Sequence, residues 1–295
     1  MNIGIIGQGF VGSAIREGLK DFYDIKAYDI DKSKCWNITN KDSSCEVVNE
    51  SDIVFICVPT PMRKDGSCDT RILVSAIDSA YKNLADHQRP KHSDFLNFQK
   101  ERKTFVIKST VLPGTTERLA ENYPKINLCF SPEFLTEANA WNDFKNQNRI
   151  ILGGDGAKIV KQMFRRPFPK ASIIVTKSKT AEMVKYFTNC FLATKVTFAN
   201  QMYEICEAGN IDYDKVCEYA LHDTRIGKSH LAVPGPDGDY GFGGHCFPKD
   251  LAAMVEFGNS LNAETGFLKE IEALNNYYRT NKDWENMKGR AVSDD

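Results

Sequence analysis

Apolar runs and segments of helical periodicity alternate along the first 176 residues of the chain. In the helical segments apolar residues recur three or four positions apart, and the apolar runs between them are short. This alternation predicts a mostly parallel sheet covered by helices on both faces. The expected strands are Asn2–Ile6, Ile25–Tyr28, Ile53–Val58, Thr104–Lys108, Asn127–Phe130, Arg149–Gly153 and Ser172–Val175.

The pattern becomes helical throughout after Thr180. From Ala181 to Gly209, apolar residues at three- and four-residue spacing with few helix breakers predict one long connecting helix. A loop bearing glycine and proline is expected at 224–239. Further helices are expected at Asp212–His222, Leu251–Gly258 and Phe267–Tyr278.

The predicted fold class is therefore α/β, with two domains. A doubly wound Rossmann domain is expected at residues 1–178, and the long connecting helix with a small all-helical domain at residues 179–295. The helical half favours a homodimer, although an amphipathic helix is more often plain core than interface. The polar segment 86–103 is interpreted as a surface insertion, and the tail from Lys282 is expected to fray.

Composition and charge exclude several classes of partner. The formal net charge of −1 gives no overall electrostatic reason to bind nucleic acid or a membrane surface. No apolar run reaches the roughly 18 residues of a membrane span, and the N-terminus enters a strand without a secretory leader, so a cytoplasmic location is expected. The nine cysteines include no C-x-x-C pair, so they are interpreted as reduced thiols and no metal site is expected.

A glycine motif follows the first expected strand. Gly7, Gly9 and Gly12 form the pattern G-x-G-x-x-G, which also contains Phe10 and Val11 and leads into helical residues. The first glycine permits a tight turn, the second lets a pyrophosphate reach the backbone, and the third lets helix pack on strand. In this context the motif predicts a dinucleotide site at the helix N-terminus.

Asp29 ends the second expected strand and indicates which dinucleotide is bound. Its carboxylate is close to the spacing expected of a residue that accepts a hydrogen bond from a ribose 2′-hydroxyl, and it would repel a 2′-phosphate. NAD is therefore favoured over NADP, although Lys32 and Lys34 nearby weaken the preference.

A second motif combines glycines with one cysteine at an expected helix start. Pro248 suits the first turn of a helix, which places Cys246 at the helix N-terminus. There the unpaired N–H groups favour a thiolate, and Lys249 adds a cation. Asp250, four residues on from Cys246, lies on the same helix face and is a candidate to hold or deprotonate a water. The alternative is a buried structural cysteine beside a glycine turn.

Five motifs in this order resemble the UDP-glucose/GDP-mannose dehydrogenase family of nucleotide-sugar 6-dehydrogenases, from Met1 to about Asn276. They are Gly7–Gly12, Val58-Pro59-Thr60-Pro61, Lys108-Ser109-Thr110-Val111, Ser131-Pro132-Glu133-Phe134-Leu135-Thr136-Glu137 and Gly243-Gly244-His245-Cys246. The resemblance implies a four-electron oxidation of a sugar C6 alcohol to a carboxylate with two NAD. UDP-glucose, giving UDP-glucuronate, is the expected substrate, with GDP-mannose and UDP-N-acetyl-mannosamine as variants. A second oxidation at C6 needs a covalent thiohemiacetal, which explains the cysteine.

The resemblance also implies roles for single residues. Cys246 is the expected nucleophile, Lys185 and Asn189 are expected to donate to an oxyanion at C6, and Asp250 and Thr110 to place water. Glu133 is a candidate acid or base, and Glu137 is expected near the nicotinamide. Cofactor contacts are further expected from Val58, Pro59, Thr60 and Thr110. Substrate contacts are expected from Glu133, Phe134, Leu135, Lys185, Asn189, Tyr240, Gly241 and Gly244.

The same residues have plainer interpretations. Lys185 and Asn189, four apart on a helix, are most often part of a solvated face, and Glu133 and Glu137 could be a helix-start carboxylate and a surface carboxylate. Without the family pattern these interpretations would be preferred.

The sequence departs from the family by ending before the second Rossmann-like domain, which in full-length members grips the nucleotide. A natural short form, a separate nucleotide-binding polypeptide or a shortened sequence would each explain this. A single-hydride β-hydroxyacid dehydrogenase, which also combines a Rossmann domain with a Lys/Asn helix, is one alternative; such an enzyme has no use for Cys246. The other alternative is a non-catalytic sugar-nucleotide-binding subunit that needs a partner domain.

Overall fold

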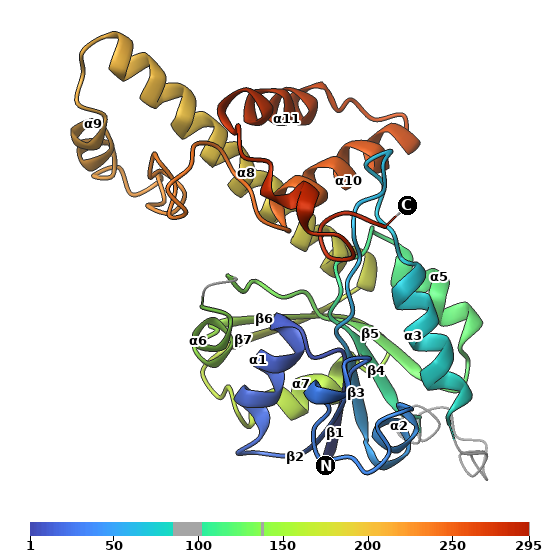
Figure 1. The fold of residues 1–295 in the computed structure, drawn as a ribbon. Helices are drawn as coiled ribbons and strands as arrows, with labels where there is room; N and C mark the ends of the chain where they lie inside the picture. The colour runs from blue at the N-terminus through green and yellow to red at the C-terminus, as the bar shows by residue number, and fades with distance from the viewer. Residues whose placement is uncertain (85–101, 137–138, 295) are drawn as a thin grey trace. The chain divides into compact units, whose positions relative to one another are not determined.

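The computed structural model describes residues 1–84, 102–136 and 139–294. Contacts divide the chain into two units, Met1–Thr60 with Thr70–Lys185 and Pro61–Asp69 with Tyr186–Asp295 (Figure 1). The division falls inside helix α8 (Ser178–Ala208), whereas the boundary expected from the sequence lies between residues 178 and 179 and stays a prediction. None of the helices in the described ranges is both long and apolar enough to cross a membrane.

The first unit is built on one seven-stranded sheet with the order β2-β1-β3-β4-β5-β6-β7. Every neighbouring pair is parallel except β5 and β6, which run antiparallel. The mostly parallel α/β fold expected from the sequence is therefore confirmed. The strands are β1 (Asn2–Ile6), β2 (Asp24–Tyr28), β3 (Ile53–Ile56), β4 (Thr104–Ile107), β5 (Asn127–Phe130), β6 (Arg149–Gly154) and β7 (Ser172–Thr176).

Alternate residues of each central strand enter two separate cores, because successive side chains of a strand point to opposite faces. Ile3 and Ile5 of β1 pack in one core, whereas Ile6 packs in the other. The first core is covered by α1 (Phe10–Leu19), α6 (Ala140–Lys145) and α7 (Ala157–Arg165). The second is covered by α2 (Cys45–Glu50), α3 (Arg71–Lys82), α5 (Thr115–Asn122) and the first turn of α8.

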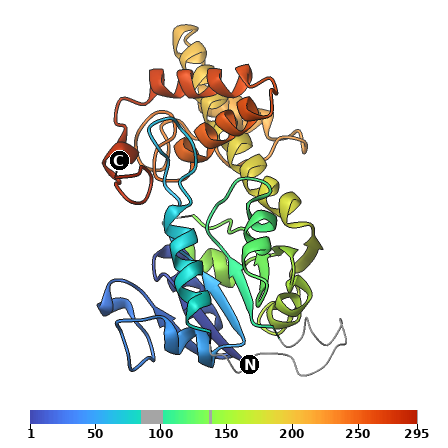
Figure 2. The same cartoon turned by 90° about the vertical axis from the view of Figure 1, so that its right-hand side faces the viewer.

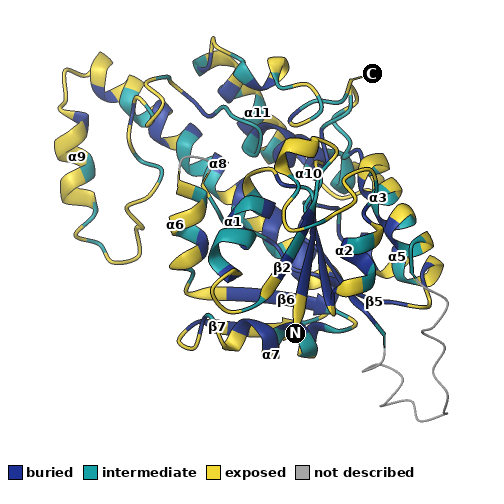
Figure 3. Cartoon of the chain, turned by 60° about the horizontal axis from the view of Figure 1, so that its bottom comes forward, coloured by how far each residue is buried: buried dark blue, intermediate teal, exposed yellow. Residues whose placement is uncertain are grey.

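Figure 1 and Figure 2 both show α3 and α5 side by side on the second face. Figure 3 shows the consequence for burial, with dark blue strands enclosed by helices that turn yellow, exposed residues outward. β1 lies where the strand order reverses, between β2 and β3. In open α/β sheets this position, outside the carboxyl ends of the strands, is where ligands bind.

The second unit is helical, as expected. Besides most of α8 it contains α9 (Tyr213–Ala220), α10 (Phe247–Ser260) and α11 (Gly266–Tyr278). Cys190 of α8, Leu251 of α10 and Ile271 of α11 share one buried cluster. Farther along α8, a second cluster joins this helix to α9 through Ala199, Cys206 and Tyr213.

The expectation that the tail frays from Lys282 is wrong. A short 3-10 helix, η3 (Asp283–Asn286), buries Trp284, and Ala291 is 1% exposed. The backbone of Met62 donates to Ala291 and accepts from Ser293, at 2.8 Å in each case. Apolar burial and backbone pairing together hold the tail against the segment Pro61–Asp69.

The polar segment 86–103 lies outside the described residues except at its end. There Lys103 is only 8% exposed, and its ammonium donates to the carbonyl oxygens of Asn49 (2.9 Å) and Ser51 (2.6 Å). Lys103 is therefore a buried residue of the first unit and not part of a surface insertion.

Candidate active site

The glycine motif forms the turn between β1 and α1, and each glycine has a distinct steric reason. Gly7 has φ +93°, and a Cβ there would lie 2.5 Å from the carbonyl oxygen of Cys57. A Cβ on Gly12 would lie 1.9 Å from the carbonyl oxygen of Gly7, so helix and strand touch at this residue. Gly9 is the N-cap of α1, and a Cβ there would meet nothing within 4 Å. Only the second glycine faces open space, as required of the residue that a pyrophosphate approaches.

Asp29 follows β2 and is held beside this turn. One carboxylate oxygen accepts the backbone N–H of Gln8 at 2.6 Å and the other accepts that of Asp31 at 2.8 Å. Because a carboxylate has about four acceptor positions, Asp29 keeps capacity for ribose hydroxyls while its orientation is fixed. The turn and Asp29 together fit a dinucleotide that carries a 2′-hydroxyl. Phe10 and Val11, in the first turn of α1, are partly exposed beside it.

Substituting alanine at Gly9 and, separately, at Gly12 distinguishes an effect on NAD binding from an effect on stability. With Gly9→Ala we expect NAD affinity to fall about tenfold or more, ~1.4 kcal/mol, with little change in thermal unfolding, because the methyl group meets only the ligand. With Gly12→Ala we expect a loss of about 1–3 kcal/mol in unfolding free energy, because the methyl group overlaps Gly7. Calorimetric titration with NAD and thermal unfolding test this. Equal losses of stability in both variants would refute the assignment of Gly9.

The loops after β3 and β4 are tied together at the same edge of the sheet. The Thr60 hydroxyl donates to the carbonyl oxygen of Thr110 at 2.7 Å, and the Ser109 hydroxyl donates to that of Val58 at 2.5 Å. Pro59, which lies between Val58 and Thr60 in the sequence, is exposed. The structure thus brings together the residues of these loops that the family resemblance assigned to the cofactor. Glu137, assigned to it as well, lies outside the described residues.

Glu133 and Lys185 form a buried ion pair in the first unit. The Lys185 ammonium donates to Glu133 Oε1 at 2.7 Å and to the Glu133 carbonyl oxygen at 2.9 Å. The Leu135 N–H donates to Glu133 Oε2 at 2.7 Å, and the Phe134 ring stacks under the Arg149 guanidinium, 4.2 Å from the ring centroid. Burial raises the pKa of Glu133, but Lys185 and these hydrogen bonds outweigh it and hold the pKa below its ordinary value. Glu133 is therefore an anion near neutral pH, able to accept a proton.

Helix α8 delivers Lys185 to this position because its first turn is anchored to α5. The buried Glu182 carboxylate accepts the backbone N–H groups of Gly114 (2.6 Å) and Thr116 (2.8 Å). These groups belong to the N-terminal turn of α5, where an anion is favoured. Lys185 lies one helical turn after Glu182. The solvated-face interpretation of Lys185 is therefore wrong for this residue, which is 3% exposed.

Lys108, at the end of β4, is a charged residue whose importance the sequence did not reveal. Its ammonium donates to the Ser131 hydroxyl (3.2 Å) and to the Pro132 carbonyl oxygen (3.0 Å), in the loop that leads to Glu133. Burial lowers the pKa of Lys108 to about 8, against the effect of Glu133. The sequence signals were the place of Lys108 directly after an apolar run and at the start of the motif Lys108-Ser109-Thr110-Val111, and neither indicated that its ammonium is buried.

The lowered pKa of Lys108 makes stability depend on pH. A lysine whose folded pKa is below its unfolded pKa destabilises the protein at low pH, and stability rises as pH passes from the folded toward the unfolded value. Relative to Lys108→Met, we expect the wild-type unfolding free energy to rise between about pH 8 and about pH 10.5, by up to ~3 kcal/mol. Urea unfolding of both proteins across this range measures the difference. A difference that stays constant would contradict the lowered pKa.

A second buried cluster surrounds the start of α10 in the second unit. Cys246 is the N-cap of α10 and Pro248 lies in its first turn, as the sequence predicted. The Asp250 carboxylate, 1% exposed, accepts the side-chain N–H of Asn189 at 2.6 Å and an ion-paired hydrogen bond from Lys249. Burial lowers the pKa of Lys249, but Asp250 and then Cys246 outweigh it, and the pKa stands above its ordinary value. A permanent cation therefore lies close to the Cys246 thiol.

The glycine loop before Cys246 contains the remaining predicted substrate residues. Gly241 (φ +66°) and Gly244 (φ +71°) have left-handed backbones, and a Cβ on Gly244 would meet nothing within 4 Å. Tyr240 is 43% exposed and its ring lies 5.8 Å from that of Tyr203.

Asn189 lies one turn after Lys185 on α8, so these two side chains project from the same face of one helix. Among the described residues, no group of three His, Cys, Asp or Glu side chains is arranged to hold a metal ion.

Comparison with known families matches both units. Residues 34–168 match the NAD binding domain of the UDP-glucose/GDP-mannose dehydrogenase family, and residues 179–277 match its central domain. The putative UDP-glucose 6-dehydrogenase YtcA of Bacillus subtilis (strain 168) is 31% identical over 313 aligned positions, which cover 93% of this chain and 67% of YtcA. This chain therefore spans about two thirds of the length of that relative. The match to the NAD binding domain, together with the glycine turn, identifies NAD as the cofactor.

Solved structures agree on the fold. A UDP-glucose dehydrogenase from the hyperthermophilic archaeon Pyrobaculum islandicum superposes with a TM-score of 0.77 at 28% identity, covering 94% of this chain and 68% of that one. The 3-hydroxyisobutyrate dehydrogenase of Mycobacterium tuberculosis superposes with a TM-score of 0.70 at 16% identity, covering 95% of this chain and 94% of that one. At that identity the second likeness shows the fold alone.

Proposed function

Because the chain belongs to the UDP-glucose/GDP-mannose dehydrogenase family, we propose that it oxidises the C6 alcohol of a nucleotide sugar to a carboxylate in two steps. The expected substrate is UDP-glucose, and the product UDP-glucuronate. NAD, when bound at the glycine turn, would accept one hydride from C6, and a second NAD bound there in turn would accept the other. Gly7, Gly9 and Gly12 form that turn and Asp29 orients the ribose.

The observation that carries the proposal is the thiol of Cys246 at the N-terminus of α10, beside the Lys249 cation. Both the helix N-terminus and the cation favour the thiolate, which is the nucleophilic form. After the first oxidation the thiolate adds to the C6 aldehyde, forming a C–S bond and an oxyanion. Loss of the second hydride from C6 leaves a thioester, and water then breaks the C–S bond to release the carboxylate and the thiol. Both hydrides are thus lost from C6, and the C–S bond that forms at C6 is later broken by water.

The two buried clusters supply the other roles. Lys185 and Asn189, one turn apart on α8, are proposed to donate hydrogen bonds to the oxyanion at C6. Glu133, an anion through its pairing with Lys185, is proposed to accept a proton from the attacking water. Asp250 holds Asn189 and Lys249 and, together with Thr110, is proposed to place that water. Phe134, Leu135, Tyr240, Gly241 and Gly244 remain proposed substrate contacts.

A homodimer through the helical unit belongs to the same proposal. Phe187, Phe191 and Phe198 on α8 are 70%, 57% and 57% exposed, and the first two rings stack. Exposed apolar side chains gathered on one helix favour a protein partner. Sedimentation velocity of the purified chain tests this, and a monomer at all concentrations would exclude it. The nucleotide of the substrate would be held by this chain's own loops, by the partner copy of a dimer or by a separate nucleotide-binding domain.

The single-hydride β-hydroxyacid dehydrogenase is kept as a second candidate, because that class also combines a Rossmann domain with a Lys/Asn helix, as Lys185 and Asn189 on α8 do here. The test is to incubate the chain with NAD and, separately, UDP-glucose, GDP-mannose, UDP-N-acetyl-mannosamine or a small β-hydroxyacid, and to identify products by chromatography. A uronate from a nucleotide sugar supports the first proposal. Oxidation of the hydroxyacid alone would refute it in favour of the second, and NAD or sugar-nucleotide binding without any product would favour a non-catalytic subunit.

A further inference from the structure

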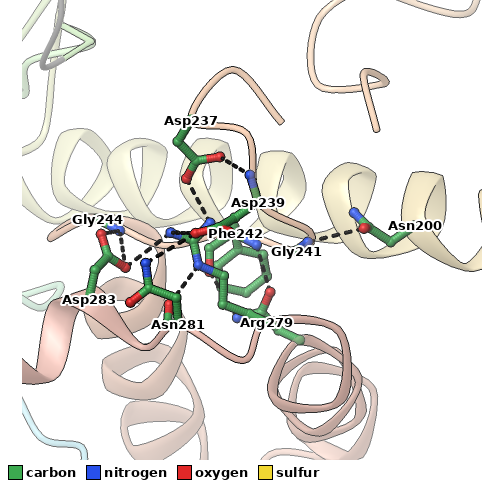
Figure 4. A network of polar contacts seen from close by, with 10 residues as sticks. Asn200, Asp237, Asp239, Gly241, Phe242, Gly244, Arg279, Asn281 and Asp283 are labelled. Atoms are coloured by element: carbon green, nitrogen blue, oxygen red, sulfur yellow. Dashed lines mark hydrogen bonds and ion pairs between the residues drawn. The ribbon is translucent and has the colours of Figure 1, made fainter. Parts of the chain in front are cut away.

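Arg279 is a buried cation surrounded by carboxylates in the second unit. It is the C-cap of α11, its side chain is 2% exposed, and it pairs with Asp237 (2.6 Å), Asp283 (3.2 Å) and Asp239 (3.5 Å) (Figure 4). Its Nε also donates to the carbonyl oxygen of Asn281 at 2.8 Å. Removing a charged group from water is expensive unless its partners are well placed, so this cluster fixes the segments that contribute to it.

The cluster contacts the backbone of the loop that leads to Cys246. Asp283 accepts the Gly244 N–H with both oxygens, at 3.2 and 3.1 Å. A Cβ on Gly243 would lie 2.3 Å from Asp283 Oδ1 and 2.4 Å from Arg279 Nη2. The main chain at Gly243 and Gly244 therefore packs directly on the Arg279–Asp283 ion pair, with no room for a side chain at Gly243.

The preceding residues of the loop are held in the same way. The Gly241 N–H donates to Asn200 Oδ1 at 3.0 Å, and the Phe242 N–H donates to Asn275 Oδ1 at 2.7 Å (Figure 4). Asn275 also donates to the Phe242 carbonyl oxygen at 3.0 Å, and its own carbonyl accepts the Arg279 N–H at 2.8 Å. Side chains of α8, α11 and η3 thus fix the loop up to two residues before Cys246.

We propose that Arg279, acting through Asp283, is a positioning residue that sets the backbone of Gly243 and Gly244 and thereby the placement and reactivity of the Cys246 thiol. The inference rests on the proposed function in taking Cys246 as the nucleophile. Arg279 itself touches neither substrate nor cofactor in this role. A displacement of about 1 Å at a reacting atom costs about 10²-fold in rate. A change in the loop backbone that moves the Cys246 thiol is therefore expected to slow the reaction.

The chain offers a matched control for the test. Asp283 and Asp237 both pair with Arg279, but only Asp283 bonds the Gly244 N–H. Asp283→Ala and Asp237→Ala each remove one carboxylate from the same guanidinium. Asp283→Asn keeps an acceptor oxygen for Gly244 while removing the charge. The three variants separate loss of an ion pair from loss of the loop contact.

The measurement is the rate of Cys246 alkylation by iodoacetamide from about pH 6 to about pH 9, located by peptide mass spectrometry. NADH formation and thermal unfolding are followed on the same samples. We expect Asp283→Ala to change the pH profile of Cys246 alkylation and to lower kcat about tenfold or more, with the KM for NAD unchanged. Asp283→Asn should restore part of both, and Asp237→Ala should leave both within about twofold.

Equal alkylation profiles in the two alanine variants would overturn the proposal, because the loop contact would then be irrelevant to the thiol. If Asp283→Ala does not fold, Asp283→Asn provides the test. The proposal would be overturned if Asp283→Asn kept both the wild-type alkylation profile and the wild-type kcat while Asp237→Ala was also unaffected. Alkylation needs no turnover. A chain that oxidises no nucleotide sugar would therefore contradict the proposed function while the alkylation profiles still test the positioning role.

Discussion

Replacement of Cys246 by alanine is expected to abolish uronate formation, by on the order of 10⁴-fold or more. The thiol is the only proposed covalent partner of the C6 aldehyde, so the second hydride cannot be lost from a thiohemiacetal without it. NAD affinity should be unchanged, because the substitution leaves the glycine turn and Asp29, the residues proposed to hold NAD, unaltered. Chromatographic assay of uronate and calorimetric titration with NAD measure the two properties.

The control is Cys45→Ala, which removes an exposed thiol at the first residue of α2. It should leave turnover and NAD affinity at wild-type values. An equal loss of NAD affinity and of thermal stability in Cys246→Ala would instead indicate that Cys246 is a structural cysteine. Acid quenching of the wild-type reaction followed by mass spectrometry adds a direct check, since a sugar adduct should be found on the peptide that contains Cys246.

Replacement of Lys185 by methionine is expected to lower both activity and stability. Loss of an oxyanion donor costs about 10²–10³ in kcat. Breaking a buried ion pair leaves Glu133 unpaired, at a cost of about 3–5 kcal/mol in unfolding free energy. Steady-state kinetics and urea unfolding measure the two losses.

In Lys185→Met, the pH dependence of the contribution that Glu133 makes to the unfolding free energy should also change sign. With Lys185 present, the pKa of Glu133 is lowered, so its contribution to stability is present above the unfolded pKa and is lost as pH falls through the folded pKa. Without Lys185, burial raises that pKa, so stability falls as pH rises above about 4.3, the unfolded value. The double variant Lys185→Met with Glu133→Gln should recover stability without recovering activity. Full recovery of activity in the double variant would show that Lys185 serves only to compensate Glu133.

The sequence predicted the elements well because each rests on local periodicity. Strands such as Asn2–Ile6 are short buried runs, and α8 is a long amphipathic pattern, so neither needs long-range information. The N-cap position of Cys246 was likewise predictable, because Pro248 and the glycines before it are local signals. The conformations required at the glycine turn follow from the G-x-G-x-x-G pattern in the same way.

Pairings between distant segments were not predictable. Glu133 and Lys185 are 52 residues apart, and nothing in the local sequence says that one neutralises the other. The contact of Asp283 with the Gly244 N–H joins residues 39 apart, and the Arg279–Asp237 ion pair joins residues 42 apart. The polar loop around Asp237 gave no sign of a buried partner. The tail was expected to fray because it is polar, yet Trp284 and Ala291 are buried. Burial through long-range contacts of this kind cannot be predicted from the polar composition of a segment.

The central claim is that one carbon is oxidised twice on one chain, and the ratio of NADH formed to UDP-glucose consumed tests it most directly. The proposed thioester mechanism predicts two NADH per sugar with uronate as the only product, and loss of uronate in Cys246→Ala. A ratio of one in the wild-type protein, with an aldehyde or keto product, would contradict the mechanism and favour single-hydride chemistry.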